Sequence, residues 1–205
     1  MSSRLRSLFS LVAISTPAAF MAACATDSIA SGIDRAIALM DLRGNARTPL
    51  AVTAETSAAV LVFVTTDCPI ANAYAPEISA IAREYEQRGF EFFVVHVDPD
   101  VSADDARRHA GEYALDEESV ILDPEHDLVR ALGITITPEV AVVRSDASIA
   151  YRGRIDDQWA DFGKKRRAAR KQDLRAALDA ILGGRSVGET RTMAVGCSIP
   201  IIAER

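Results

Sequence analysis

The residue best placed for chemistry is Cys68, which follows a short apolar segment and directly precedes Pro69. Proline is favoured in the first turn of an α-helix, so this pair indicates that a helix begins here. A sulfur at that point faces unpaired backbone N–H groups and the positive end of the helix dipole, and both stabilise a thiolate. Because the thiolate is the nucleophile, the pattern predicts a reactive thiol. The alternative is a small buried side chain, since unpaired cysteine is often buried.

The N-terminal residues have the layout of a secretory signal, with a short basic start and an apolar stretch over 7–23 that ends in small residues. The sequence MAAC at 21–24 also resembles a bacterial lipobox, in which the cysteine is lipidated and becomes the new N-terminus. We therefore expect residues 1–23 to be a lipoprotein-type signal peptide. Cys24 would then anchor the protein to a membrane on the periplasmic side of the bacterial cell envelope. Ordinary cleavage, with Cys24 lost or incidental, is the alternative.

Export changes how the cysteines are interpreted, because disulfides persist outside the reducing cytoplasm. If Cys24 carries a lipid, Cys68 and Cys197 remain, and they allow a single internal bridge. Cys197 lies in an apolar C-terminal stretch, TRTMAVGCSIP. We predict that Cys68 and Cys197 come together as a redox-active pair, with Cys68 as the attacking thiol and Cys197 as the resolving thiol.

Composition excludes some classes of function. The 205 residues are 49% hydrophobic and 25% charged, which is ordinary for a soluble globular domain with a full core. A net charge of -6 argues against nucleic acid as a partner. The cysteines are far apart and the histidines, His96, His109 and His126, fall in no ligand-like cluster, so the sequence indicates neither a metal nor another cofactor.

Apolar periodicity predicts the elements that position Cys68. Continuous apolar runs over 58–64 and 90–97 predict strands that are buried on both faces. Between them, apolar residues at helical spacing over 68–88 predict a helix, with a kink or restart at Pro76 and an end at Gly89.

The other expected elements complete an α/β order with an antiparallel hairpin near its end. They are a tether and edge hairpin over 24–50, a capped helix over 102–113, a strand over 119–122, a brief helix that Pro124 opens, strands over 139–144 and 148–154, and a helix over 173–182. This order predicts a thioredoxin-like α/β domain over 51–183 with a central mixed β-sheet flanked by helices. A C-terminal tail over 184–205 carries Cys197.

Four segments resemble the redoxins: VLVFVTTDCPIANAYAPEI, VVHVDPD, GITITPEVAVV and YRGRIDD. This thioredoxin-fold group includes the alkyl hydroperoxide reductase/thiol-specific antioxidant proteins and the TlpA-like periplasmic proteins. The likeness covers about residues 37–199 and is strongest to the peroxiredoxin-like members. It implies an oxidoreductase that acts on a thiol or disulfide partner protein or on a peroxide.

Two motifs carry over by this resemblance. Thr65-Thr66-Asp67-Cys68 matches the T-x-x-C of peroxiredoxins, which places Cys68 at the peroxidatic position, and Thr65 is expected to offer a hydroxyl to its sulfur. Thr137-Pro138 matches the proline that is cis in the thioredoxin fold and packs beside the active cysteine. That proline presents the backbone of the preceding residue to a bound thiol or peptide.

The chain also departs from the family pattern. A C-x-x-C motif would need cysteine at position 71, which is Ala71, so Cys68 has no partner in its own helical turn. The residue after the cis-proline is Glu139 where peroxiredoxins carry an activating arginine, and its carboxylate would disfavour a thiolate. Arg152 and Arg154 are two apart in a predicted strand and so on one face, which makes them candidates for the missing cation.

A function of a different class also fits the residues. A non-catalytic, metallochaperone-like binding module would use Cys68–Cys197 as a structural bridge. Copper delivery requires two thiols with a nearby histidine or methionine, and His96 and Met193 are the candidates. A titration of the reduced protein with cuprous ion separates the two classes, since an oxidoreductase alone shows no stoichiometric tight binding.

Overall fold

The central sheet has five strands, in the spatial order β5-β4-β3-β7-β8. The structure is a computed structural model that describes residues 33–202. The strands are β3 (Ala58–Val64), β4 (Phe90–His96), β5 (Val120–Leu122), β7 (Glu139–Val143) and β8 (Ile149–Gly153). β3, β4 and β5 are parallel, whereas β7 is antiparallel to β3 and β8. This is the mixed, thioredoxin-like sheet that the sequence predicts.

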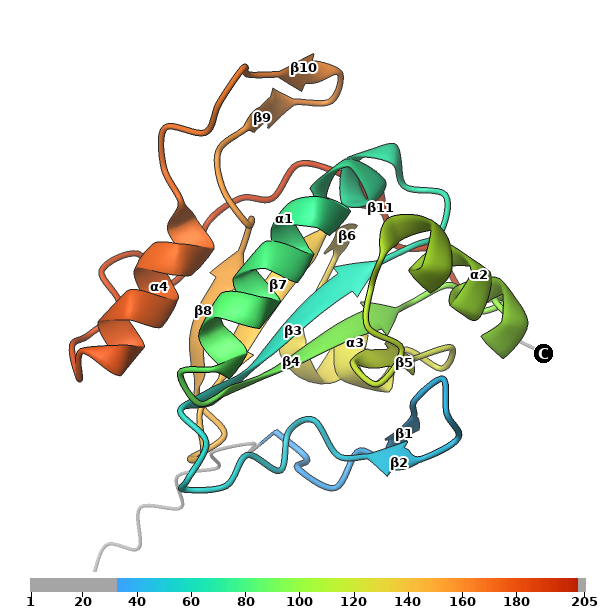
Figure 1. The fold of residues 1–205 in the computed structure, drawn as a ribbon, viewed down its shortest axis with the longest axis horizontal. Helices are drawn as coiled ribbons and strands as arrows, with labels where there is room; N and C mark the ends of the chain where they lie inside the picture. The colour runs from blue at the N-terminus through green and yellow to red at the C-terminus, as the bar shows by residue number, and fades with distance from the viewer. Residues whose placement is uncertain (1–32, 203–205) are drawn as a thin grey trace, which may run out of the picture. The chain divides into compact units, whose positions relative to one another are not determined.

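Helices cover both faces of the sheet (Figure 1). On one face lie α1 (Pro69–Glu86), α2 (Ala103–Tyr113) and α4 (Asp173–Leu182), and α3 (Asp127–Leu132) lies on the other. Successive strand residues point to opposite faces, so Val62 packs in the core beneath α1 and Phe63 in the core beneath α3. The strands are continuous apolar runs because both of their faces are buried.

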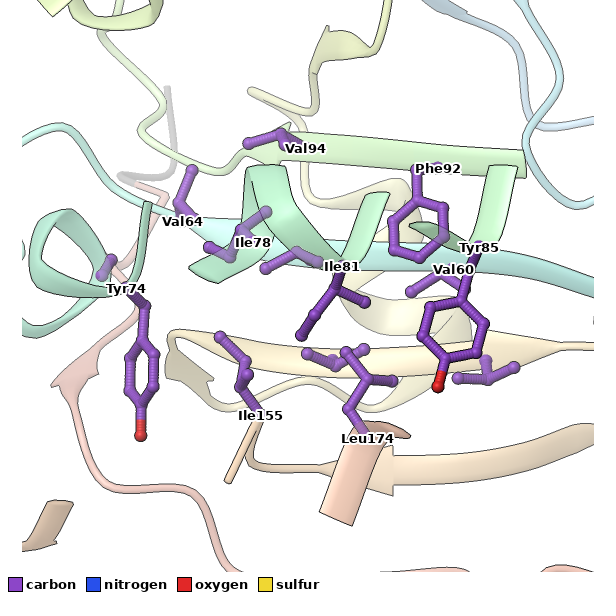
Figure 2. Close-up of a cluster of buried hydrophobic side chains, with 14 of the residues drawn as sticks. Val60, Val64, Tyr74, Ile78, Ile81, Tyr85, Phe92, Val94, Ile155 and Leu174 are labelled. Carbon is purple, nitrogen blue, oxygen red and sulfur yellow. The ribbon is translucent and has the colours of Figure 1, made fainter. Parts of the chain in front are cut away.

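The larger core holds α1 against the sheet. Figure 2 shows Ile78, Ile81 and Tyr85 of α1 lying over Val60 and Phe92 of the sheet. Each of these side chains is at most 4% exposed. Burying a side chain of this size stabilises the fold by about 1.5–3 kcal/mol relative to exposure. The apolar stripe therefore fixes the helix that begins at Cys68.

Two predicted helix starts are wrong. α1 runs unbroken through Pro76, so the helix does not restart there, and its buried residues lie on both sides of this exposed proline. α3 begins at Asp127 and not at Pro124. The reason is Asp123, a buried residue whose carboxylate accepts hydrogen bonds from the first three N–H groups of α3 and caps the helix there.

Two short hairpins flank the sheet. β1 (Leu39–Met40) and β2 (Ala46–Arg47) form the predicted edge hairpin, which meets the sheet through a bridge between Asp41 and Ile121. The second hairpin, formed by β9 (Trp159–Asp161) and β10 (Lys164–Lys165), has no strand signal in its sequence and was not predicted. The domain boundaries at residues 24, 51 and 184 stay predictions. Residues 1–23 and Cys24 lie outside the described residues.

The C-terminal tail returns to the sheet after α4. Arg191 forms a parallel bridge with Arg152 of β8, and β11 (Cys197–Ser198) then pairs antiparallel with β6 (Ile136–Thr137). Within residues 33–202, no helix has the length and apolar character that a membrane span requires.

Candidate active site

Cys68 lies at the N-terminus of α1, as predicted, and is its N-cap residue. Its Sγ accepts a hydrogen bond from the backbone N–H of Ala71 at 3.4 Å. This contact uses one of the unpaired N–H groups at the helix start, and it favours negative charge on the sulfur. The side chain is 0% exposed, so the thiol is positioned for chemistry but covered in this structure.

The turn between β6 and β7 lies against this sulfur. The Thr137–Pro138 peptide bond is cis, as predicted. The Cys68 thiol donates a hydrogen bond to the carbonyl oxygen of Thr137 at 3.1 Å. The hydroxyl of Thr65 lies 3.3 Å from the Thr137 hydroxyl, a contact that replaces its predicted bond to the sulfur. The Thr65 hydroxyl therefore joins the end of β3 to the proline turn, and its carbonyl oxygen accepts the backbone N–H of Cys68 at 3.4 Å.

The tail brings the second cysteine to the same place. Cys197 is the register partner of Thr137 in the β11–β6 pair, and its thiol lies close enough to that of Cys68 to interact with it. Both cysteines are free thiols. Burial raises the pKa of Cys197 to about 12, and Cys68 and Asp67 contribute in the same direction. Cys197 therefore keeps its proton at neutral pH.

Glu139 does not face the thiol. Along β7, Val140 packs in the core that contains Cys68 and Ala141 packs in the opposite core, so alternation places Glu139 on the far face of the sheet. Its carboxylate accepts the N–H of Thr135 at 3.0 Å and pairs with Arg152 at 3.4 Å. The expectation that this carboxylate opposes the Cys68 thiolate is therefore wrong.

Arg152 and Arg154 do not share a face. Arg152 donates to the carbonyl oxygen of Leu132 at 2.8 Å, on the α3 side. Gly153, between them, has a φ of +150°, and beyond it Arg154 turns to α4 and pairs with Asp173 at 2.7 Å. Among the contacts of residues 33–202, neither guanidinium reaches Cys68. The prediction that they supply its missing cation is wrong because both are held by other partners.

A buried pair of imidazoles lies at the end of the strand next to β3. His96 ends β4 opposite Val64 and is fully buried, and neither of its ring nitrogens has a hydrogen-bond partner within the described part of the chain. Its ring is 4.9 Å from that of His109, whose Nε2 bonds to Asn72 of α1 at 2.8 Å. Burial lowers the pKa of His96 to about 3, and it also lowers the pKa of His109. The sequence shows only that His96 ends an apolar run.

Residues 33–202 do not meet the needs of a metal site. In the part of the chain that the structure describes, no three His, Cys, Asp or Glu side chains form a group that could hold an ion. The candidates for copper differ sharply in their environment, since His96 is fully buried and Met193 is 84% exposed. The arrangement fits dithiol chemistry better than copper delivery.

Several known proteins are similar to this chain. An uncharacterized conserved protein from Geobacillus kaustophilus is 25% identical, with a TM-score of 0.70 over 82% of this chain and 90% of its own. A hypothetical protein from Sinorhizobium meliloti 1021 is also 25% identical, with a TM-score of 0.72 over 84% and 95%. A secreted disulfide oxidoreductase from Mycobacterium tuberculosis shares the fold at 19% identity, with a TM-score of 0.51 over 70% and 95%. No curated protein matches the chain significantly.

The family comparison covers the part of the chain that holds the thiol. The model described as Redoxin matches residues 36–169, which include Cys68 and Pro138 but not Cys197. The match agrees with the sheet topology and with a cysteine at the N-terminus of α1, and it supports an oxidoreductase in general. The chain belongs to the redoxin family, within the thioredoxin fold.

Proposed function

We propose that this chain is an exported thiol–disulfide oxidoreductase in which Cys68 is the nucleophile and Cys197 the resolving thiol. One observation carries the proposal: Cys197 pairs with Thr137, the residue whose carbonyl accepts the Cys68 thiol hydrogen. Two cysteines from distant parts of the chain thus both lie against Thr137, the residue that precedes Pro138. An environment of this kind suits a disulfide that forms and breaks.

The proposed reaction has two exchange steps. Cys68 loses its proton and attacks one sulfur of a partner disulfide, and the other partner sulfur leaves with the electron pair of the broken bond. Cys197 then loses its proton and attacks Cys68 in the mixed disulfide, which releases the partner as a dithiol. The chain ends with a Cys68–Cys197 disulfide, having given two electrons and two protons to its partner. A dithiol reductant reverses these steps and restores the chain.

Reduction of a peroxide is the second candidate, and the Thr65-Thr66-Asp67-Cys68 motif favours it. The Cys68 thiolate would attack one peroxide oxygen and break the O–O bond, so that Cys68 becomes a sulfenic acid and the rest of the peroxide leaves as water or an alcohol. Condensation with Cys197 would then release water and form the same disulfide. Disulfide exchange is favoured instead, because Arg152 is paired with Glu139 and Arg154 with Asp173. Within residues 33–202, neither guanidinium contacts Cys68, where it would have to activate a peroxide.

Thiol mapping under graded oxidant tests the proposed pair. We expect Cys68 and Cys197 to be consumed together and to form one internal disulfide, with a potential in the range of exchange proteins, roughly −270 to −120 mV. Cys197→Ser should form no internal disulfide under the same oxidant, and its Cys68 should stop at a mixed disulfide with a disulfide oxidant. A bridge that forms but resists mild reductant would favour the structural alternative. Absence of any bridge would refute the resolving role of Cys197.

We also propose that the chain is lipid-anchored in the bacterial cell envelope through Cys24. Support comes from the signal-like layout of residues 1–23 and from the lipobox-like MAAC. Mass spectrometry of membrane-fraction protein should find Cys24 at the N-terminus with a lipid mass, and Cys24→Ser should shift the protein to the soluble fraction. An unmodified N-terminus at Ala25 or later, in soluble protein, would contradict the anchor.

A further inference from the structure

The C-terminal tail covers the thiol that has to meet a partner. Cys68 is 0% exposed, although exchange with another protein requires its sulfur to reach a sulfur from outside. The tail strand β11 lies antiparallel along β6 and pairs Cys197 with Thr137. It therefore occupies the backbone edge nearest to Cys68, since Thr137 is also the residue that accepts the Cys68 thiol hydrogen.

Gly196 permits this close approach. A Cβ atom at position 196 would lie 1.9 Å from the carbonyl oxygen of Thr137 and 3.1 Å from Cδ of Pro138. The first of these atoms belongs to the backbone and cannot move aside as a flexible side chain would. A strand that lies on β6 in this register therefore needs glycine immediately before its cysteine.

The tail is anchored at Thr192 and less firmly held beyond it. The N–H of Thr192 donates to the carbonyl oxygen of Arg152 at 3.0 Å, and its hydroxyl lies 2.7 Å from that of Tyr151. Beyond this anchor, none of residues 193–200 is fully buried, and the side chain of Met193 is 84% exposed. Segments with little buried apolar surface open at low free-energy cost. Lifting the tail from β6 would leave the main core intact.

We propose that the tail is the resident occupant of a peptide-docking edge, and that an extended partner segment carrying Gly-Cys replaces it on β6 to reach Cys68. The inference rests on the proposed thiol–disulfide exchange, for which it names the class of partner. The partner strand pairs antiparallel with Ile136–Thr137 and places its sulfur where that of Cys197 lies. Its glycine meets the Thr137 carbonyl as Gly196 does.

Alkylation of Cys68 tests whether the tail is the cover. In a Cys197→Ser background, we expect Gly196→Ala to raise the rate of Cys68 alkylation by iodoacetamide, mapped by mass spectrometry, about tenfold or more. Gly188→Ala is the matched control, because a Cβ at that tail position meets nothing within 4 Å. It should leave the rate unchanged. Equal rates in the parent and both variants would overturn the proposal.

Circular dichroism and a thermal melt verify that each variant is folded. If Gly196→Ala does not fold, Ser198→Pro weakens the same pairing, since proline is a poor strand residue. It should raise the alkylation rate in the same way, and an unchanged rate would again overturn the proposal.

Two activated peptides test the Gly-Cys requirement. TMAVGCSIP and TMAVACSIP are each supplied as a mixed disulfide with thionitrobenzoate and added to the Gly196→Ala/Cys197→Ser chain. Cys68 loses its proton to solvent and attacks the peptide sulfur, and thionitrobenzoate leaves with the electron pair, which its absorbance reports. We expect the glycine peptide to react about tenfold faster. Equal rates would overturn the docking register.

The outcomes separate this inference from the proposed function. If no Cys68–Cys197 disulfide forms in the parent chain, the proposed function fails, but the alkylation rates still report whether the tail covers Cys68. If the disulfide forms while Gly196→Ala leaves alkylation unchanged, the exchange function stands and the tail inference fails.

Discussion

Cys68→Ser is expected to abolish disulfide exchange, with kcat/KM falling by at least about a thousandfold. A serine hydroxyl is not ionised near neutral pH and cannot replace the thiolate. The fold should survive, because serine is close to cysteine in size and is a favoured N-cap that can accept the N–H of Ala71. The measurement is the rate at which the reduced protein exchanges with oxidised glutathione, with circular dichroism as the control for folding.

Cys197→Ser is the matched comparison for Cys68→Ser. It should block the second exchange step, in which Cys197 attacks the mixed disulfide at Cys68. The first attack by Cys68 remains, so the variant should release one equivalent of thiol and then accumulate a mixed disulfide. In the parent chain, resolution should accelerate as pH rises above neutral, because burial raises the pKa of Cys197 to about 12 and little thiolate exists below that value. Full turnover by Cys197→Ser would show that an external thiol resolves Cys68.

The free energy of unfolding is expected to fall steeply on the acid side of neutrality because of His96. Burial lowers the pKa of His96 from 6.5 to about 3 in the folded chain. The folded state therefore binds fewer protons than the unfolded state between these values. The contribution of His96 is complete above 6.5 and is lost as pH falls towards 3. At about pH 5 the loss reaches about 2 kcal/mol, and the lowered pKa of His109 adds to it.

His96→Leu is the variant that tests this cause. Leucine is close to histidine in size and leaves no unpaired ring nitrogen, so stability at neutral pH should be equal or greater. Denaturant unfolding at neutral and acid pH gives the two free energies. We expect the variant to lose less stability on acidification than the parent. Equal losses would show that the acid sensitivity arises elsewhere.

Local sequence was enough to predict the main elements and the position of the thiol. The runs that form β3 and β4, the amphipathic spacing of α1 and the Cys68-Pro69 pair are signals within a few residues of one another. Each reflects the burial or backbone geometry of a single segment. The cis-proline turn was predicted from the redoxin resemblance, and its place beside Cys68 agrees with that prediction.

The directions of side chains were decided by tertiary structure. Glu139 faces away from Cys68 because strand alternation in β7 is set by its pairing with β3 and β8. Arg154 leaves the face of Arg152 because Gly153 adopts a positive φ, which residue spacing alone does not reveal. Thr65 bonds to Thr137 because the end of β3 and the proline turn meet only in the folded sheet.

The contact between the two cysteines depends on both the local sequence and the tertiary structure. Counting cysteines and the absence of one at Ala71 suggested the pair, but the contact itself requires the tail to return across β8 and lie on β6. Only the folded chain shows that Gly196 passes against the Thr137 carbonyl and that Cys68 is fully buried. Contacts between segments so far apart depend on the path of the whole chain, whereas each helix and strand depends mainly on its own residues.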